Sequence, residues 1–364
     1  MSNLHVRSRA RFGALLLLLT LPLAAATVSS EDPSALPSEI MPRTAKSLLL
    51  DLTRTANAFY AVGERGHVLR SADGRNWVQL NLPTRSALTS IATADGQLWV
   101  AGHDGVILHS ADGGQSWKPQ RRDPYRLAKG ESARDHDPRQ GAPILDIYFS
   151  DASNGIAIGA YSLMLLTHDG GATWTPEQAI APAAQRATAA PMKGDVFSQE
   201  DLQLDEEADP HLNSVINAGP GTMVIVGERG TCLRSNNGGK SWQRLAFPYK
   251  GSMFGVLSLG DGRLLAYGLR GNVYQSTDLG SSWSKVATQG SVSLMGGVAL
   301  DNGGVALAGA NGTILYRPSL AAPFVATTFK NANGETPALA GILPAGKGNF
   351  VLVGDKGADL THLQ

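Results

Sequence analysis

A four-residue turn, Gly-x-x-Gly, recurs along the chain and presents a variable side chain at its third position. In the seven copies this side chain is Arg65, Asp104, Tyr161, Arg229, Arg270, Asn311 or Lys356, so four of the seven are basic. Basic groups gathered on one surface bind carboxylates and other anions through charge-assisted hydrogen bonds. The set is therefore our candidate partner-binding site, although exposed turn tips favour polar residues in proteins that bind nothing there.

Carboxylates beside the same turns raise a second possibility, glycoside hydrolysis. That reaction needs two carboxylates about 5 to 9.5 Å apart, or a Tyr nucleophile with an acidic partner. Glu64, Asp104 and Asp355 are the candidates, but nothing in the sequence marks one of them as a catalytic acid. The sequence favours a protein with no catalytic residue, no metal and no cofactor, and it leaves a glycan-cleaving or glycan-binding protein as the alternative.

A second motif, [S/T]-x-D-x-G-x-[S/T]-W, follows the Gly-x-x-Gly turn in several copies. It is complete at 110–117, 167–174 and 276–283, has Asn at 235–242, and is one residue short at 71–77. Its acidic or amide positions are Asp73, Asp112, Asp169, Asn237 and Asp278, and its aromatic positions are Trp77, Trp117, Trp174, Trp242 and Trp283. The Asp should accept backbone N–H bonds within its own turn, and the Trp should pack between sheets. Because the motif repeats, we interpret it as structural.

These motifs belong to seven copies of one unit. The first glycines of the turns are Gly63, Gly102, Gly159, Gly227, Gly268, Gly309 and Gly354, with steps of 39, 57, 68, 41, 41 and 45 residues. Four steps lie near the 40 to 45 residues of a four-stranded propeller blade, and each unit contains four short strand patterns. We expect glycine to supply the positive φ of a tight hairpin. Since one four-stranded sheet cannot bury both faces, the prediction is an all-β, seven-bladed β-propeller.

The propeller is predicted over 47–364, with insertions at about 119–143 and 176–212. The first insertion is rich in arginine and the second in Asp and Glu. They belong to the same face as the Gly-x-x-Gly turns, and they could pair with each other, grip a partner or cap the channel. The last unit ends after its third strand, so we predict that the segment 27–46 supplies the missing outer strand, from residues around Glu39 to Met41.

The first 26 residues are typical of a secretory signal peptide. Arg7, Arg9 and Arg11 precede an apolar run over 12–23, and three alanines end at Ala26, the expected cleavage site. Twelve apolar residues are too few to span a bilayer. We therefore expect a periplasmic or otherwise exported protein without a membrane span.

Composition narrows the possible partners further. The 31 basic and 31 acidic residues balance, which disfavours nucleic acid as a partner. The one cysteine, Cys232, cannot form an internal disulfide. We expect a monomer.

The VGERG segments at 62–66 and 226–230, combined with the SADGGQSW type of motif, resemble the photosystem II stability/assembly factor-like propellers with BNR, or Asp-box, repeats. This resemblance implies a non-enzymatic assembly factor that binds a membrane-protein subunit through arginines on one face. It places Arg65, Arg229 and Arg270 at positions of that type. The resulting expectation is a periplasmic factor that helps to assemble or stabilise a membrane-associated protein partner.

Overall fold

The computed structural model describes residues 32–127, 130, 137–178, 209–288 and 290–363. The predicted signal peptide at 1–26 lies outside these residues. Within the compact unit Asp32–Gln364, the chain forms seven antiparallel sheets in which each strand pairs with its sequence neighbours. No helix in these described ranges is long and apolar enough to cross a membrane.

Each sheet is one blade, numbered here in chain order. Blade 1 contains β1 (Leu49–Arg54), β2 (Phe59–Gly63), β3 (Val68–Ser71) and β4 (Val78–Leu80). Blade 2 contains β5 (Leu88–Ala94), β6 (Gln97–Gly102), β7 (Ile107–Ser110) and β8 (Lys118–Arg121). Blade 3 contains β9 (Ile144–Phe149), β10 (Gly155–Gly159), β11 (Met164–Thr167) and β12 (Thr175–Pro176). Blades 4 and 5 contain β13 (Leu212–Gly219), β14 (Thr222–Gly227), β15 (Cys232–Ser235), β16 (Gln243–Arg244); β17 (Met253–Gly260), β18 (Arg263–Gly268), β19 (Val273–Ser276) and β20 (Ser284–Lys285).

Blades 6 and 7 complete the ring. They contain β21 (Leu294–Ala299), β22 (Val305–Gly309), β23 (Thr313–Arg317), β24 (Val325–Thr328); β25 (Leu339–Gly346), β26 (Asn349–Gly354) and β27 (Gly357–His362). The helical elements are single 3-10 turns, η1 (Pro33–Ala35), η2 (Thr44–Lys46), η3 (Glu64–Gly66), η4 (His103–Gly105), η5 (Ala160–Ser162), η6 (Leu269–Gly271) and η7 (Ala310–Gly312). The predicted seven-bladed, all-β propeller is confirmed.

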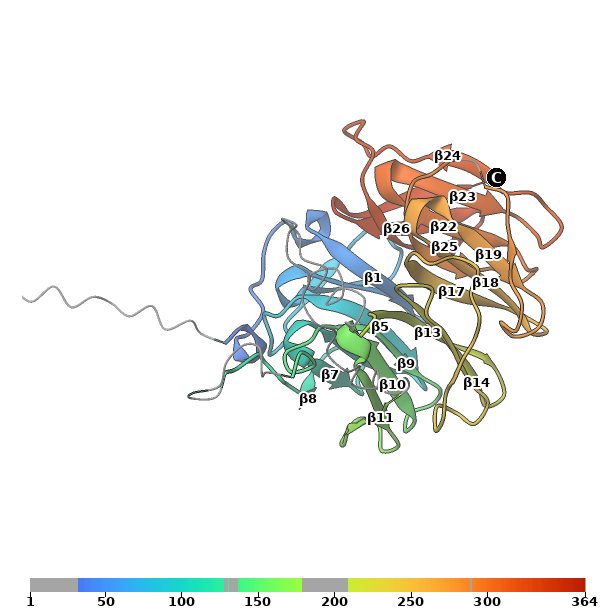
Figure 1. Ribbon diagram of the computed structural model, residues 1–364. Helices are drawn as coiled ribbons and strands as arrows, with labels where there is room; N and C mark the ends of the chain where they lie inside the picture. The colour runs from blue at the N-terminus through green and yellow to red at the C-terminus, as the bar shows by residue number, and fades with distance from the viewer. Residues whose placement is uncertain (1–31, 128–129, 131–136, 179–208, 289, 364) are drawn as a thin grey trace, which may run out of the picture. The chain divides into compact units, whose positions relative to one another are not determined.

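Contacts between first strands close the ring. The first strand of each blade contacts that of the next, and β25 of blade 7 contacts β1 of blade 1. Figure 1 shows this order as colours that run from blue through green and yellow to red, until the red and blue blades meet. Seven apolar clusters fill the seven junctions between blades, so most of the core lies between sheets. Cys232 is one of these core residues, and burial raises its thiol pKa to about 12.

The predicted closing strand at Glu39–Met41 is not observed. Blade 7 has three strands, β25 to β27, among the described residues. The Glu39 carbonyl oxygen and the Met41 N–H instead hydrogen-bond the side-chain amide of Gln79, in β4 of blade 1. Pro37 and Pro42 flank this short segment, and proline has no N–H to donate to a strand ladder.

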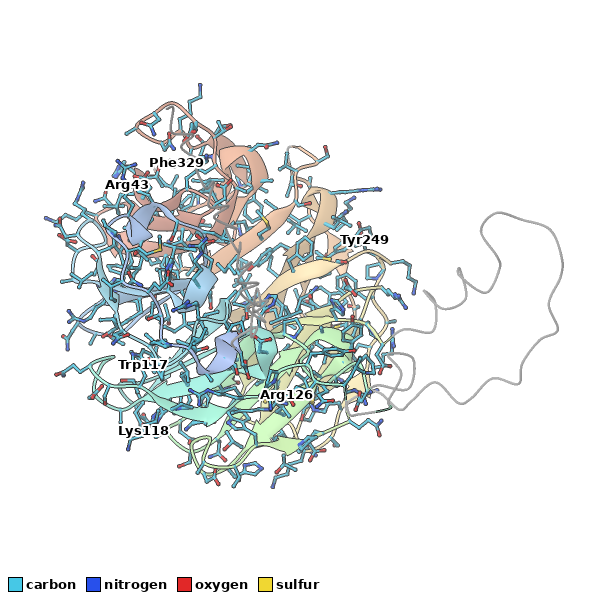
Figure 2. The ribbon with its side chains drawn as sticks, turned by 90° about the vertical axis from the view of Figure 1, so that its left-hand side faces the viewer. Arg43, Trp117, Lys118, Arg126, Tyr249 and Phe329 are labelled. Carbon is cyan, nitrogen blue, oxygen red and sulfur yellow. The ribbon has the colours of Figure 1, made fainter. Side chains whose placement is uncertain are left out.

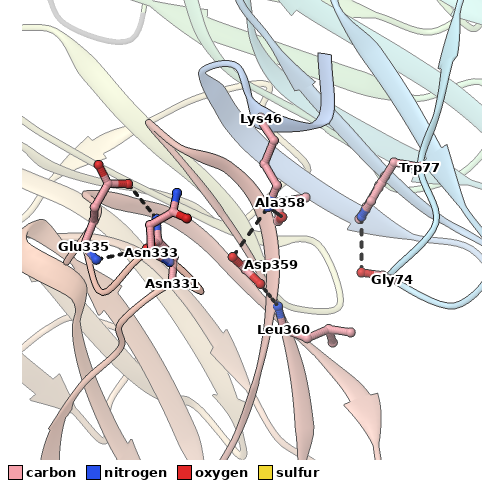
Figure 3. A network of polar contacts seen from close by, with 9 residues as sticks. All are labelled: Lys46, Gly74, Trp77, Asn331, Asn333, Glu335, Ala358, Asp359 and Leu360. Atoms are coloured by element: carbon pink, nitrogen blue, oxygen red, sulfur yellow. Dashed lines mark hydrogen bonds and ion pairs between the residues drawn. The ribbon is translucent and has the colours of Figure 1, made fainter. Parts of the chain in front are cut away.

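The N-terminal segment nevertheless joins blade 7 to blade 1, through η2. Lys46 donates a hydrogen bond to the Ala358 carbonyl and lies 3.7 Å from the Asp359 carboxylate (Figure 3). A Cβ added to Gly357 would lie 2.0 Å from the Ala45 carbonyl oxygen, just as one on Gly66 would lie 2.1 Å from the Thr84 carbonyl. Ala45 therefore lies against blade 7 as Thr84 lies against blade 1, and Thr84 belongs to the link that follows the outer strand β4.

Candidate functional site

The seven Gly-x-x-Gly turns join the second and third strands of the blades. In an antiparallel meander these turns and the links between blades emerge on one face, which we call the GxxG face. In blades 1 to 6 the third residue of the turn has a positive φ, between 54° for Arg65 and 58° for Arg270. A left-handed backbone at a residue other than glycine is uncommon, and here it projects a variable side chain from six of the seven turns.

Six of the seven turns have two glycines, and these have different reasons to be there; in blade 3 the last position is Ser162, which also has a positive φ, of 56°. The last one does have a positive φ, as at Gly66 with 69°. The first is extended, with φ −171° at Gly63, so our expectation of a positive φ was wrong for this position. It is required by close approach, because a Cβ on Gly63 would lie 2.0 Å from the Leu48 carbonyl oxygen, on the chain that enters the same blade.

The structure distributes the predicted partner-binding residues one per blade rather than in one patch. Arg65, Tyr161, Arg229, Arg270, Asn311 and Lys356 are exposed, whereas Asp104 is half-buried. Blades 4 and 5 are neighbours, and so are blades 7 and 1. The basic residues therefore form two pairs on the GxxG face, Arg229 with Arg270 and Lys356 with Arg65.

Asp104, Tyr161 and Lys356 contact other side chains of the chain. The Asp104 carboxylate accepts a hydrogen bond from the Ser86 hydroxyl. The Tyr161 ring packs edge-on against His211, with ring centroids 5.2 Å apart. Lys356 lies 3.5 Å from the Glu335 carboxylate, whose pKa is lowered by a hydrogen bond from Asn331 and by the charge of Lys356. The side chains of Arg65 and Arg270 form no ion pair with any residue that the structure describes.

The two insertions meet at their edges. Arg139 of the first insertion and Asp209 of the second form an ion pair with an N–O distance of 2.7 Å. The Arg139 Nε also donates to the carbonyl of Tyr161 in the GxxG turn of blade 3. The first insertion begins after β8, which extends to Arg121. Residues 179–208 of the second insertion lie outside the described residues, as do 128–129 and 131–136 of the first.

The N-terminal segment adds a second set of contacts on this side of blades 1 and 2. Arg126, which is labelled in Figure 2, forms an ion pair with Asp32 at 2.8 Å, and Glu39 forms one with Arg85 at 2.9 Å. The Arg85 N–H donates to the Pro33 carbonyl. These contacts hold 32–41 against the link from blade 1 to blade 2.

The turns between third and fourth strands, called outer turns here, lie on the opposite face. The carboxylates of Asp73, Asp112, Asp169 and Asp278 accept hydrogen bonds within their own turns, and Asn237 does so with its amide oxygen. The backbone N–H and hydroxyl of Thr173 hold the pKa of Asp169 at about 2, and the hydroxyl and N–H of Ser282 do the same for Asp278. Carboxylates so stabilised in their charged form are poor proton donors.

The aromatic residues of the outer turns lie in the blade junctions. Trp117, Trp174, Trp242, Trp283 and Trp77 belong to the clusters that join blades 1 and 2, 2 and 3, 3 and 4, 4 and 5, and 7 and 1. Figure 2 shows Trp117 and the exposed Lys118 at the periphery of blade 2. The Trp77 indole N–H also donates to the Gly74 carbonyl (Figure 3).

Two carboxylates at the ring centre were not predicted from the sequence. Asp51 on β1 accepts a hydrogen bond from the Ile91 N–H of blade 2, and Asp146 on β9 accepts one from the Val215 N–H of blade 4, each at 2.8 Å. The Ser90 hydroxyl of blade 2 donates to Asp146 at 3.0 Å. These side chains link the first strands of blades 1 to 4.

Desolvation raises the pKa of Asp51 to about 6 and that of Asp146 to about 7, although backbone N–H bonds oppose the shift. Repulsion from Asp51 adds to the effect on Asp146. Both residues follow the same bulge in their strands. Comparing that one position across all seven units would have found them.

The fold and its repeated turns define this protein as a seven-bladed propeller built from homologous units. Its sequence matches the family model described as "Photosynthesis system II assembly factor YCF48" over residues 35–125 and 138–309, and the chain belongs to that family. No curated protein matches the sequence. The resemblance seen in the sequence is confirmed.

Three solved structures illustrate the fold. A structure titled "YCF48 bound to D1 peptide" has 18% identity and a TM-score of 0.61, covering 90% of this chain and 96% of its own. YCF48 from Cyanidioschyzon merolae has 16% identity and a TM-score of 0.62, covering 89% and 98%. The GH74 enzyme of Niastella koreensis has 14% identity and a TM-score of 0.63, covering 88% of this chain but 53% of its own. At these identities each likeness shows the fold alone.

Proposed function

We propose that this protein is an exported, non-enzymatic assembly factor that binds a membrane-associated protein partner through its GxxG face. Membership of the YCF48 family supports an assembly role, and a relative in that family has been captured with a D1 peptide. The amino-terminal pattern at 1–26 supports export. The GH74 likeness supports a shared fold rather than shared chemistry.

The observation that carries the proposal is the choice of residue at the turn tips. A bulky side chain in the left-handed region costs roughly 1 to 2 kcal/mol relative to glycine. Folding alone would favour Gly or Asn there, yet three of the six positions with a positive φ hold exposed arginines; Lys356, in the seventh turn, has no positive φ and carries none of this cost. An acidic or carboxylate-bearing segment that contacts Arg229 and Arg270, or Lys356 and Arg65, would compensate this cost when it binds.

The chain itself supplies backbone-compatible test variants. Asp104 and Asn311 adopt the same positive φ as the arginines. We therefore expect Arg229→Asp with Arg270→Asp to fold normally and to weaken capture of the partner by roughly tenfold or more, and the two Arg→Asn changes to weaken it less. The measurement is cross-linked pull-down from envelope membranes, followed by affinity measurement on the recovered partner at two salt concentrations.

Lys118→Asp, on the periphery of blade 2, is the matched control and should leave capture unchanged. Equal capture by the Asp double variant and the original chain would overturn the use of this face. Cell fractionation tests export separately: the original chain should appear in the envelope fraction, and a chain that lacks 1–26 should remain in the cytoplasm.

A further inference from the structure

A pocket of about 420 Å³ opens between blades 3 and 4, on the face opposite to the GxxG turns. Its floor is apolar and comes from the buried side chains of Ile156, Leu166 and Met223. The half-buried ring of Tyr148 forms one side. The volume lies within the range of about 300 to 1,000 Å³ that is typical of small-molecule sites.

The rim of the pocket is polar and carries one sign of charge. Exposed amides of Asn154, Asn217 and Asn237 surround the opening together with Lys240. No carboxylate is among the described residues that line it. Lys240 forms no ion pair with any residue in the described ranges, so its ammonium group is available to a ligand.

Comparison with the preceding junction explains why this space is open. In blade 2 the position of Ile156 is held by Trp99, which is fully buried and stacks on Phe149 with ring centroids 3.7 Å apart. The Trp99 indole N–H donates to the Gly170 carbonyl in the outer turn of blade 3. Ile156 is shorter and has no donor, so the equivalent Gly238 lines an open pocket.

The cavity at the junction of blades 1 and 2 is a contrasting case. It measures about 560 Å³, but a tyrosine and an arginine cross it. The Tyr60 hydroxyl donates to the Gly113 carbonyl at 2.9 Å, and the Arg70 Nε lies 3.3 Å from the same hydroxyl. Asp112 also lines this cavity. Its polar groups are paired with each other, whereas those of the blade 3–4 pocket surround an apolar floor.

We propose that the blade 3–4 pocket binds a small amphipathic organic anion. The apolar body of the ligand lies on Ile156, Leu166 and Met223, and its anionic head accepts hydrogen bonds from Lys240 and a rim amide. Charge complementarity sets the class, because the described residues of the lining offer the Lys240 ammonium and the Asn217 amide N–H but no carboxylate. The amide groups of Asn154 and Asn237, in contrast, already donate to Asp151 and Ser241. This site is independent of the partner-binding face, since it lies on the other side of the ring.

The test uses the full exported chain and two fluorescent probes. The first is 8-anilinonaphthalene-1-sulfonate, which has an aromatic body and one sulfonate, and the second is the uncharged N-phenyl-1-naphthylamine. We expect saturable binding of both probes to one site. Ile156→Trp places the residue of blade 2 in the pocket and should weaken both probes at least tenfold, while Ile156→Leu, the matched control, should change neither by more than about twofold.

Charge is tested separately with Lys240→Met, an exposed position that should not affect folding. This variant should bind the sulfonate probe at least fivefold more weakly and the uncharged probe as before. If Ile156→Trp fails to fold, as judged by circular dichroism, Thr222→Trp on the half-exposed pocket wall serves as the filling variant. The absence of saturable binding, or equal binding by a folded filling variant, would overturn the site. Equal binding of the sulfonate by Lys240→Met would overturn its anionic specificity.

Discussion

Blades 1 to 4 and blades 5 to 7 meet at the ring centre through different contacts. All seven first strands have a register shift at the same point. The residue that follows it is polar in the first group, Asp51, Ser90, Asp146 and Ser214, and glycine in the second, Gly255, Gly296 and Gly341. The register shift of the backbone is therefore common to all seven blades, while the side chains that join neighbouring blades differ.

Hydrogen bonds join the first group. The inner edge of a first strand has backbone N–H groups without a ladder partner, and such groups need an acceptor. Asp51 supplies one to blade 2 and Asp146 one to blade 4. The carboxylates leave water for this purpose, which is why their pKa values rise to about 6 and about 7.

Close packing joins the second group. A Cβ on Gly255 would lie 2.2 Å from the hydroxyl oxygen of Tyr267, and one on Gly296 would lie 2.3 Å from the Ala340 carbonyl oxygen. Gly297, beside Gly296, also makes room for the Tyr267 ring, which would lie 2.9 Å from an added Cβ. Tyr267 is buried and fills the space that a polar side chain would need. The comparison indicates that one repeated backbone tolerates two unlike ways of joining neighbouring blades.

The largest expected effect is the loss of an acceptor in the first group. Asp146→Ala leaves the Val215 N–H without its side-chain acceptor and removes the bond from Ser90. We expect the free energy of unfolding to fall by about 3 kcal/mol, since an unsatisfied buried donor costs about 1 to 3 kcal/mol and the bonds to the carboxyl are lost as well. The measurement is urea unfolding at pH 5, where the carboxyl is largely uncharged.

Ser214→Ala is the matched control for that prediction. It changes the same position in blade 4, where no hydrogen bond of the side chain is found among the described residues, and it should cost less than about 0.5 kcal/mol. If Asp146→Ala and Ser214→Ala lowered the free energy of unfolding by similar amounts, the hydrogen bonds of Asp146 would contribute little. The distinction between hydrogen-bonded and closely packed blades would then be wrong.

The second prediction concerns the packed group. Gly255→Ala forces a methyl group against the Tyr267 hydroxyl and should lower the free energy of unfolding by about 2 kcal/mol, as overpacking typically costs 1 to 3 kcal/mol. Tyr267→Leu alone should also destabilise, by leaving a cavity. The double variant should lose less than the sum of the two single losses. Additive losses in a double-mutant cycle would show that the glycine and the tyrosine are not coupled.

The sequence predicted the blades better than it predicted how they are joined. The number of blades followed from the spacing of Gly63 and its six equivalents, because a repeated unit repeats its turns. The outer-turn residues were recognised for the same reason: Asp112 and Trp117 recur with the motif. Asp51 and Asp146 were missed because they depart from the repeat, and aliphatic residues surround them in sequence.

The closing strand was mispredicted because strand count was inferred from blade symmetry. Ala45 does lie where symmetry places a link, but the residues before it are held by the side chain of Gln79 rather than by β27. Residue periodicity cannot predict that a glutamine side-chain amide, rather than a neighbouring strand, will hydrogen-bond the backbone of this segment. Which basic turn tips are neighbours could be predicted, since blade order is chain order, whereas the ion pairs of Lys356 and Arg139 could not.

The third prediction uses the pH dependence of the bridged group. A carboxyl whose pKa is raised on folding stabilises the protein in its protonated form, so stability should fall as pH rises from about 4 to about 7, the interval between the usual Asp pKa and the values of Asp51 and Asp146. Asp146→Asn keeps an acceptor oxygen but cannot ionise. We expect it to gain roughly 2 to 3 kcal/mol relative to the original chain between pH 5 and pH 8.

The outer turns supply a separate pH window as an internal reference. Asp169 and Asp278 have pKa values lowered to about 2, so their stabilisation is present above about pH 4 and is lost as pH falls toward 2. Asp146→Asn should leave this loss of stability at acid pH unchanged. Unfolding curves collected from pH 3 to pH 8 check both pH ranges, and parallel curves for the two proteins above pH 5 would contradict a buried titrating carboxyl at position 146.

The smallest expected effect comes from removing a single hydroxyl group, that of Ser90, from the hydrogen bonds that join blades 1 to 4. Ser90 donates its one hydroxyl hydrogen to Asp146, which lowers the pKa of that carboxyl, while its own oxygen accepts the Ile147 N–H at 3.3 Å. Because Ile147 has a second, shorter acceptor in Asp146 at 2.8 Å, Ser90→Ala should cost about 1 kcal/mol or less. It should also raise the pKa of Asp146, which ¹³C titration of labelled aspartates measures directly. Unchanged titration of Asp146 in the variant would mean that the hydroxyl does not connect blade 2 to this carboxyl of blade 3, and that blades 1 to 4 are joined by two separate bridges.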